Sequence, residues 1–290
     1  MYSIYHFFKT LVDNRYFLLE SDKKLEDFPF DSKMLSCKNK GYFPDLAIRL
    51  NPQNSLFTGG ELIELKDSKK EYIVTSFNST IPSGTKKISE LIEGDPGITK
   101  GKPGIQKQMK KAGDDISSLD DREVYYLVRG KKNSNIKVLL VHGSFFETIQ
   151  TSDLISQSFA QILEERLQQS ELEGHQIAEM KQLLVPLFSE QAPFSKVRSV
   201  DKASVKLRFR IMTEVAAEAD ILNSKQYPEI PDNTLNFVLP CHAESDSEII
   251  LQRMHNVFAE KDFVTFERFF KQFKLKHHFN GDFLVFQICL

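Results

Sequence analysis

The stretch FPDLAIRL (residues 43–50), followed by ELIELK (residues 61–66), decides the fold class of this chain. Apolar and polar residues alternate in both segments, and turn-forming residues separate them, so we predict two neighbouring strands. If the two strands pair, Asp45 lies across from Glu64. Successive strand residues point to opposite faces, so Lys66 is expected to share a face with Glu64. Two carboxylates and an amine then meet at one edge of a sheet.

The other face of the second strand is apolar. Ile63 and Leu65 alternate with the two charged residues, and we expect both to be buried.

The rest of the pattern predicts an α/β chain. Further strands are expected at 71–77, 123–128, 136–142, 205–211 and 283–288, and helices at 2–20, 152–184 (interrupted near Gly174) and 248–273. This order predicts a mixed central sheet flanked by helices over residues 1–193. A smaller mixed α+β C-terminal part is expected over residues 194–290, with a role in DNA recognition or dimerisation.

Composition bounds the class of protein. The 290 residues are 41% hydrophobic, enough for one substantial core or two smaller domains. No apolar run approaches the ~20 residues that cross a bilayer, so no membrane partner is expected. The first 17 residues lack the features of a signal peptide, which predicts a cytoplasmic protein. Three widely spaced cysteines form neither a disulfide framework nor a paired metal-ligand motif.

Charge is unevenly placed along the chain. The net charge of -2 argues against a protein that coats nucleic acid by charge alone. Residues 66–111 and 196–210 are nevertheless rich in Lys and Arg, whereas residues 151–193 are acidic. Basic patches of this kind can bind DNA locally, although ordinary solvated faces would give the same counts.

The acidic pair and the lysine suggest metal chemistry. Two close carboxylates repel each other, and a divalent cation between them removes the conflict. Mg²⁺ prefers oxygen ligands, so Asp45, Glu64 and the backbone carbonyl of Leu65 are the candidate ligands. Lys66 is then placed to orient an attacking water or to stabilise developing negative charge.

The residues Pro44, Asp45, Glu64 and Lys66 have the spacing of the PD-(D/E)XK nuclease superfamily, and the chain resembles its type II restriction endonucleases. The resemblance covers about 25 contiguous residues. It implies a restriction-endonuclease-like fold and Mg²⁺-dependent hydrolysis of double-stranded DNA at a short specific sequence. The two acids would bind the metal and the lysine would assist the water. The alternative is a surface ion pair on an ordinary hairpin.

The loop after the second strand resembles the substrate-contacting loops of these enzymes. Hydroxyls and lysines suit phosphate oxygens, and amides and arginines suit base edges. The candidate DNA contacts are Ser76, Asn78, Ser79, Thr80, Ser83, Lys86, Lys87, Lys102, Lys107, Arg208 and Arg210. Glu20, at the end of the first predicted helix, is a candidate to support the metal-binding residues from behind.

The predicted activity implies particular partners. Cutting both strands of a palindromic site is most simply done by a homodimer, and a DNA methyltransferase acting on the same site would be its companion without being a subunit. Two rival readings remain open: a structure-selective DNA repair or recombination nuclease, and a non-catalytic DNA-binding protein. His142 is expected to be structural, and His277 and His278 to form an exposed pair.

Overall fold

The computed structural model describes residues 43–47, 60–68, 72–74, 76–77, 81–89, 120–188, 197–198, 201–208, 213–257 and 267–290. The helix predicted at residues 2–20 lies outside these ranges. Within them, no helix has the length and apolar character needed to cross a membrane.

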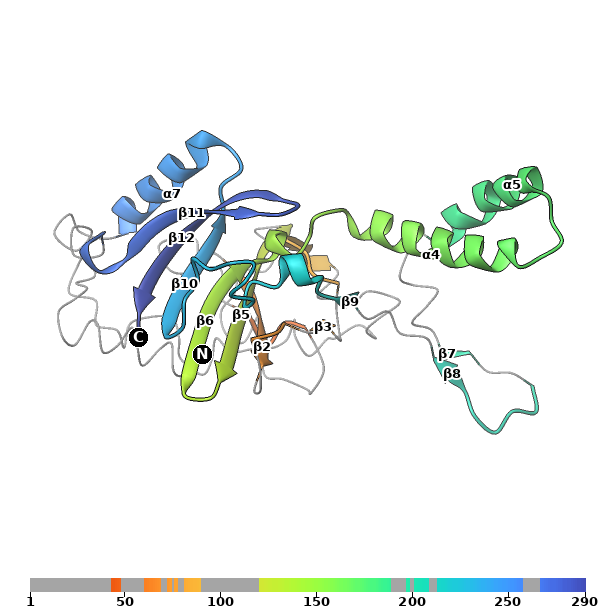
Figure 1. Cartoon of the computed structure of the whole chain (residues 1–290), viewed down its shortest axis with the longest axis horizontal. Coiled ribbons are helices and arrows are strands. Elements are labelled where there is room, and N and C mark those ends of the chain that lie inside the picture. Colours follow the sequence, from red (N-terminus) through yellow and green to blue (C-terminus); the bar gives the residue numbers. More distant parts are fainter. Residues whose placement is uncertain are drawn as a thin grey trace.

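A mixed β-sheet forms the centre of the molecule (Figure 1). Its order is β1 (Leu46–Ala47), β2 (Leu62–Ser68), β5 (Asp121–Lys132), β6 (Asn135–His142), β10 (Thr234–Pro240), β12 (Gly281–Cys289) and β11 (Lys271–His277), with β4 (Thr85–Lys87) paired to β5 beside this path. The β2–β5 and β6–β10 pairs are parallel, and the other pairs are antiparallel. The predicted α/β class is therefore confirmed.

The hairpin of β5 and β6 is the centre of this sheet and follows its predicted strands closely. Val124, Tyr126 and Val128 alternate with more exposed neighbours and enter the main core. A tight turn joins the two strands, and Asn133 adopts a positive φ of 55° there. Asparagine tolerates this conformation better than most residues, which is why it suits such turns.

The two faces of the sheet are covered in different ways. On one face, an irregular segment brings Ile221, Leu222 and Ile230 into the main core, where all three are fully buried. On the other face, Ile250 and Leu251 of α7 (Glu244–Val257) pack against strands β10 and β12. Figure 1 shows α7 lying across this end of the sheet.

The predicted boundary at residue 193 does not separate two sheets. Strands β10, β11 and β12 all follow it in sequence, yet β10 pairs with β6 and joins the same sheet. The parallel pairing of β6 with β10 is a long-range contact that no local pattern encodes, which is why the sequence suggested a separate C-terminal part.

A helical hairpin extends away from the sheet (Figure 1). It consists of α4 (Thr151–Gln168), α5 (Gly174–Leu184) and the short helix η3 (Val185–Phe188). The prediction of helix over 152–184 with a break near Gly174 is confirmed. The second helix starts there because Glu173 and Gln176 form a reciprocal capping box that satisfies its first backbone N–H groups.

Three other predicted elements differ in extent. Of the strand expected at 71–77, the structure describes β3 (Ser76–Phe77), which pairs with β9 (Thr213–Glu214) outside the main sheet, whereas residues 72–74 are not in a strand. Of the strand expected at 205–211, the structure describes β8 (Leu207–Arg208), paired with β7 (Val197–Arg198).

The helix expected at 248–273 was wrong at its end, because β11 begins at Lys271. There Phe273, Leu275 and His277 turn inward at every second position, and this period of two belongs to a strand.

Candidate functional site

The register of β1 and β2 brings the predicted acids together. Leu46 is paired with Ile63 and Ala47 with Leu62 in an antiparallel ladder. Continuing this register by one residue places Asp45 opposite Glu64. Directly opposite residues of an antiparallel pair share a face and have Cβ atoms about 5 Å apart. Opposite carboxyl groups of this kind can share one cation, which is the arrangement that the sequence predicts.

Asp45 is fixed to β2 by a backbone hydrogen bond. The N–H of Leu65 donates to Asp45 Oδ2 at 2.7 Å. A residue of a strand presents its N–H and its C=O to the same side, so the carbonyl of Leu65 also faces the edge where Asp45 lies. The Asp45 carboxylate and the Leu65 carbonyl thus lie at one edge of β2, with Glu64 next to Leu65 in the strand. Carboxylate and carbonyl oxygens are ligands that Mg²⁺ accepts.

Glu64 and Lys66 form an ion pair on the face that contains the main core. Glu64 is only 5% exposed, and Lys66 Nζ lies 3.4 Å from Glu64 Oε1. The same ammonium lies 4.9 Å from the centre of the Phe77 ring. An aromatic face attracts a cation, so Phe77 helps to hold the lysine beside the acid. The shared face predicted for these two charged residues is confirmed.

The opposite face of β2 was predicted only in part. Ile63 is buried against Leu127, as expected. Leu65 is 40% exposed, so the expectation that it is buried was wrong. The apolar cluster on this face gathers around Ile63 and Leu127 and does not close over Leu65.

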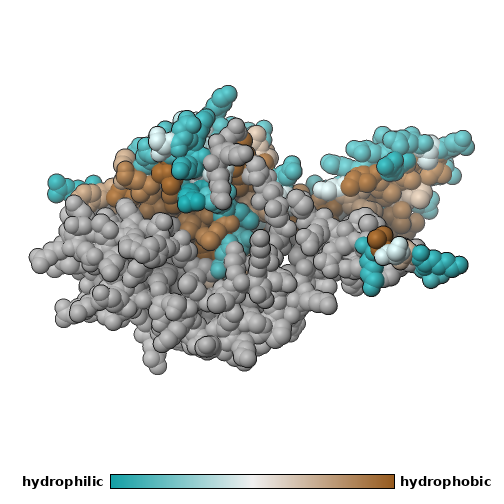
Figure 2. Space-filling view, turned by 90° about the horizontal axis from the view of Figure 1, so that it is seen from below, coloured by the Kyte–Doolittle hydropathy of each residue, from teal (hydrophilic) through white to brown (hydrophobic). Residues whose placement is uncertain are grey.

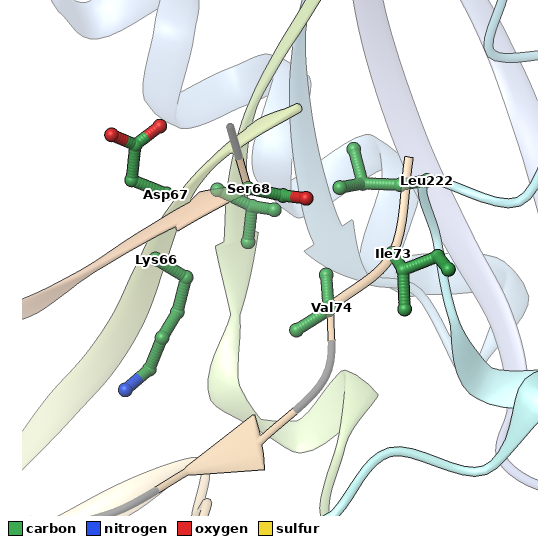
Figure 3. Close-up of a pocket in the computed structure, with 7 residues that line it drawn as sticks. Lys66, Asp67, Ser68, Ile73, Val74 and Leu222 are labelled. Atoms are coloured by element: carbon green, nitrogen blue, oxygen red, sulfur yellow. The ribbon is translucent and has the colours of Figure 1, made fainter. Parts of the chain in front are cut away.

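A small cavity of ≈ 90 Å³ lies at the end of β2 (Figure 3). It is lined by Lys66, Asp67, Ser68, Ile73, Val74, Val128 and Leu222. Figure 3 shows the side chains of Lys66 and Asp67 pointing to opposite sides of the strand. A water needs about 10–15 Å³ of such space, so the cavity has room for several waters beside the lysine.

Asp220 links two of the residues that line this cavity. Its Oδ1 accepts hydrogen bonds from the backbone N–H of Val74 at 3.2 Å and of Leu222 at 3.1 Å. Burial raises the pKa of the Asp220 carboxyl above its usual value, and these hydrogen bonds and nearby Lys137 oppose that shift. Burial lowers the pKa of the Lys137 ammonium, whose Nζ donates to the carbonyl of Leu222. Through these hydrogen bonds, Asp220 and Lys137 hold the segment that contains Val74 against the core.

The donor set fits magnesium better than a transition metal. Among the residues that the structure describes, no group of three or more His, Cys, Asp or Glu side chains surrounds a common point. A site of two carboxylates and one carbonyl falls below that number. Mg²⁺ typically takes one or two carboxylates and fills its octahedron with waters and phosphate oxygens, so such a site suits it.

The predicted DNA contacts are only partly placed. The structure puts Ser76 in β3, Ser83 just before β4, and Lys86 and Lys87 within β4. Lys86 Nζ lies 5.6 Å from the ring centre of Phe43, two residues before Asp45 in the chain. Arg208 belongs to β8, outside the main sheet. The remaining candidates lie outside the described residues: Glu20, Asn78, Ser79, Thr80, Lys102, Lys107 and Arg210.

Arg122 is a buried cation near the site that the sequence did not single out. It is 1% exposed, and its Nη1 donates to the carbonyl of Gly60 at 3.3 Å, just before β2. Gly60 has φ +85°, and a Cβ there would lie 2.0 Å from Arg122 Nη1. The glycine therefore permits both the turn and the close approach of the guanidinium. The Gly59-Gly60 pair in the sequence could have indicated that another group approaches the backbone closely there. It could not have indicated that this group is Arg122.

Three histidines were predicted from the sequence, and the structure agrees with the prediction for two of them. His142 is buried, with Nε2 2.5 Å from Glu123 Oε2 and Nδ1 2.7 Å from Ser144 Oγ, which agrees with the prediction. His278 is exposed as predicted, but His277 is buried, so the expected exposed pair was wrong. Position 277 points inward because it follows the alternation of β11.

Comparison with known proteins adds no relative to this picture. A scan against protein-family models found no match, and searches of curated proteins and of solved structures found none either.

Proposed function

We propose that this chain is a Mg²⁺-dependent type II restriction endonuclease with a restriction-endonuclease-like fold of the PD-(D/E)XK superfamily. The observation that carries the proposal is the β1–β2 register, which puts Asp45 across from Glu64 when it is continued by one residue, beside the ion pair of Glu64 with Lys66. The reaction would be hydrolysis of phosphodiester bonds in double-stranded DNA at a short specific sequence. A mixed α/β sheet with the acids on neighbouring strands supports this assignment.

Each residue of the site has a distinct role in the proposed reaction. Asp45, Glu64 and the Leu65 carbonyl would hold the metal, and Asp45 is already oriented by its bond from the Leu65 N–H. When bound, the cation would polarise the scissile phosphate and lower the pKa of a water. Lys66 would donate a hydrogen bond to the attacking water and stabilise negative charge as it develops on the phosphate.

The ion pair of Lys66 and Glu64 suits a site that binds a cation. A charge-assisted N–H···O contact is usually 2.7–2.9 Å, whereas this one is 3.4 Å. The ammonium can therefore turn from Glu64 toward a water at little cost once another positive charge neutralises the carboxylate. Phe77 keeps it nearby through its ring face.

The substrate contacts follow from the same assignment. Ser76, Ser83, Lys86 and Lys87 would contact the duplex, and the phosphate contacts among them would fix its register. A homodimer would cut both strands, a companion methyltransferase would protect the host sites, and the cytoplasm is the compartment that this function implies.

A cleavage assay with matched variants tests the proposal. The substrate is an unmethylated linear duplex long enough to contain every short sequence many times, incubated with and without Mg²⁺. Wild type should give discrete fragments only with the metal. Asp45→Asn and Lys66→Met should each lose about 100-fold or more in rate. Lys132→Met, at an exposed strand end away from the site, should cut like wild type.

The outcomes separate the rival functions. Discrete fragments support restriction, whereas smears or cuts confined to branched substrates indicate a structure-selective repair or recombination nuclease. Equal inactivity of wild type and both site variants, with DNA still bound, indicates a non-catalytic DNA-binding protein. Calorimetric titration of Mg²⁺ gives a second readout: wild type should bind, and Asp45→Asn should bind at least about 10-fold more weakly.

A further inference from the structure

The helical hairpin of α4, α5 and η3 leaves much of its apolar surface uncovered. Ile162 is 57% exposed, and Leu183 and Leu187 are each 66% exposed. Figure 2 shows apolar (brown) surface on this hairpin, bordered by hydrophilic (teal) surface. Single exposed leucines are ordinary, but a group of large apolar side chains on one projecting element marks an interaction surface.

The hairpin has little core of its own. Within α4 only Ile155 and Leu167 are buried, and α5 has no buried residue. Its two arms are joined by stacking of Phe159 on Phe188, with ring centres 3.8 Å apart, and by an ion pair of Lys181 with Glu164 at 2.6 Å. Short helices are marginal in water without tertiary packing, so a surface that covers this hairpin would stabilise it.

The charges of this part of the chain favour a second copy of the same chain as the partner. The region 151–193 that contains the hairpin is strongly acidic, and the region 196–210 that contains the β7–β8 ribbon is strongly basic. Figure 1 shows both elements at the end of the molecule that projects beyond the sheet. In a two-fold arrangement, the apolar faces of the two hairpins can pack on each other while the acidic border of each hairpin faces the basic ribbon of the other copy, and each contact occurs twice. An acidic surface repels DNA and anionic lipid, which disfavours both as occupants.

The available area is adequate for a dimer. Helices of 18 and 11 residues are about 27 and 16 Å long, and each is about 10 Å wide. Side by side they offer a face on the order of 400 Å², which is about half of the ~800 Å² per partner in a standard interface. The adjoining ribbon, where Val205 is 77% exposed, can supply the remainder.

We propose that the α4–α5 hairpin is the dimerisation surface of this chain, packing on the hairpin of a second copy as a four-helix bundle with the β7–β8 ribbons at its rim. The purpose of the dimer, two active sites for two DNA strands, rests on the proposed function. The association itself does not, because it is measured on the protein alone.

Molar mass in solution tests the interface on the full chain without DNA. Light scattering coupled to gel filtration should give twice the monomer mass for wild type at micromolar concentrations. Leu183→Glu and Leu187→Glu should each weaken self-association about 100-fold or more, since the buried charge is introduced twice in a symmetric interface. Both positions are exposed, so circular dichroism should show an unchanged fold. Ile249→Glu, at a 45% exposed apolar position on α7, is the matched control and should remain dimeric.

A second variant tests the charge argument. Lys206→Glu lies in the ribbon and should weaken the dimer, and wild type should dissociate more readily at high salt. A monomeric wild type overturns the proposal, and so does a dimer that survives both leucine substitutions. A dimer without nuclease activity leaves the interface standing and refutes only the proposed function, whereas an active nuclease that is monomeric with and without DNA refutes only the interface.

Discussion

His277 is expected to make the stability of this protein fall steeply in mild acid. The ring ends β11 and is 1% exposed, and its Nδ1 accepts a hydrogen bond from the backbone N–H of Phe279 at 3.1 Å. Phe145 packs edge-on against it, with ring centres 4.4 Å apart. Burial, with a smaller effect from the neighbouring His278, lowers the pKa of His277 from 6.5 to about 4.

The size of the effect follows from proton linkage. Between pH 6.5 and about 4 the unfolded chain binds a proton at His277 that the folded protein excludes. The stability that the neutral ring contributes is thus complete above pH 6.5 and is lost as the pH falls toward 4. A shift of about 2.5 pKa units corresponds to about 3 kcal/mol. Whole domains have only ~5–15 kcal/mol of net stability, so this one ring matters.

Urea denaturation at pH 7.5, 6, 5 and 4 measures the effect. His277→Gln has no titrating ring, so its free energy of unfolding should fall about 3 kcal/mol less than that of wild type between pH 7.5 and 4. It should nevertheless be less stable than wild type at pH 7.5, because the aromatic packing is lost. His175→Gln removes an exposed imidazole and serves as the control. Parallel pH profiles for wild type and His277→Gln would refute the reasoning.

Two further predictions concern the framework around the site. Gly143→Ala should destabilise by about 3 kcal/mol in urea denaturation, because the new Cβ would lie 1.9 Å from the backbone oxygen of Ser83. Gly174→Ala meets nothing within 4 Å and should be neutral or slightly stabilising, and an equal loss at both glycines would contradict this account. Lys137→Met should cost about 3 kcal/mol at neutral pH, because it leaves the buried Asp220 carboxylate without its nearby cation. Adding Asp220→Asn should recover part of that loss, whereas strictly additive losses in the double-mutant cycle would show that the two groups are not coupled.

Local pattern was sufficient wherever one short segment determined the outcome. The alternation in β2 predicted that Glu64 and Lys66 share one face, and the ion pair between them confirms it. A strand has a period of two, so the relative direction of side chains is known once the strand is recognised. The break before Gly174 was visible for a similar reason, since glycine and polar residues interrupt the helical apolar spacing.

The structure decided whatever depended on partners distant in sequence. The local sequence around residues 271–277 did not predict a strand there or the burial of His277. That strand is defined by its pairing with β12. Likewise, the buried guanidinium of Arg122 donates a hydrogen bond to the carbonyl of Gly60, which lies far from it in the sequence. The sequence by itself determined which charged residues alternate along β2 and which face of that strand they share. Tertiary packing alone decided which charged and titratable groups lost their water, because burial is set by distant segments that meet only in the folded chain.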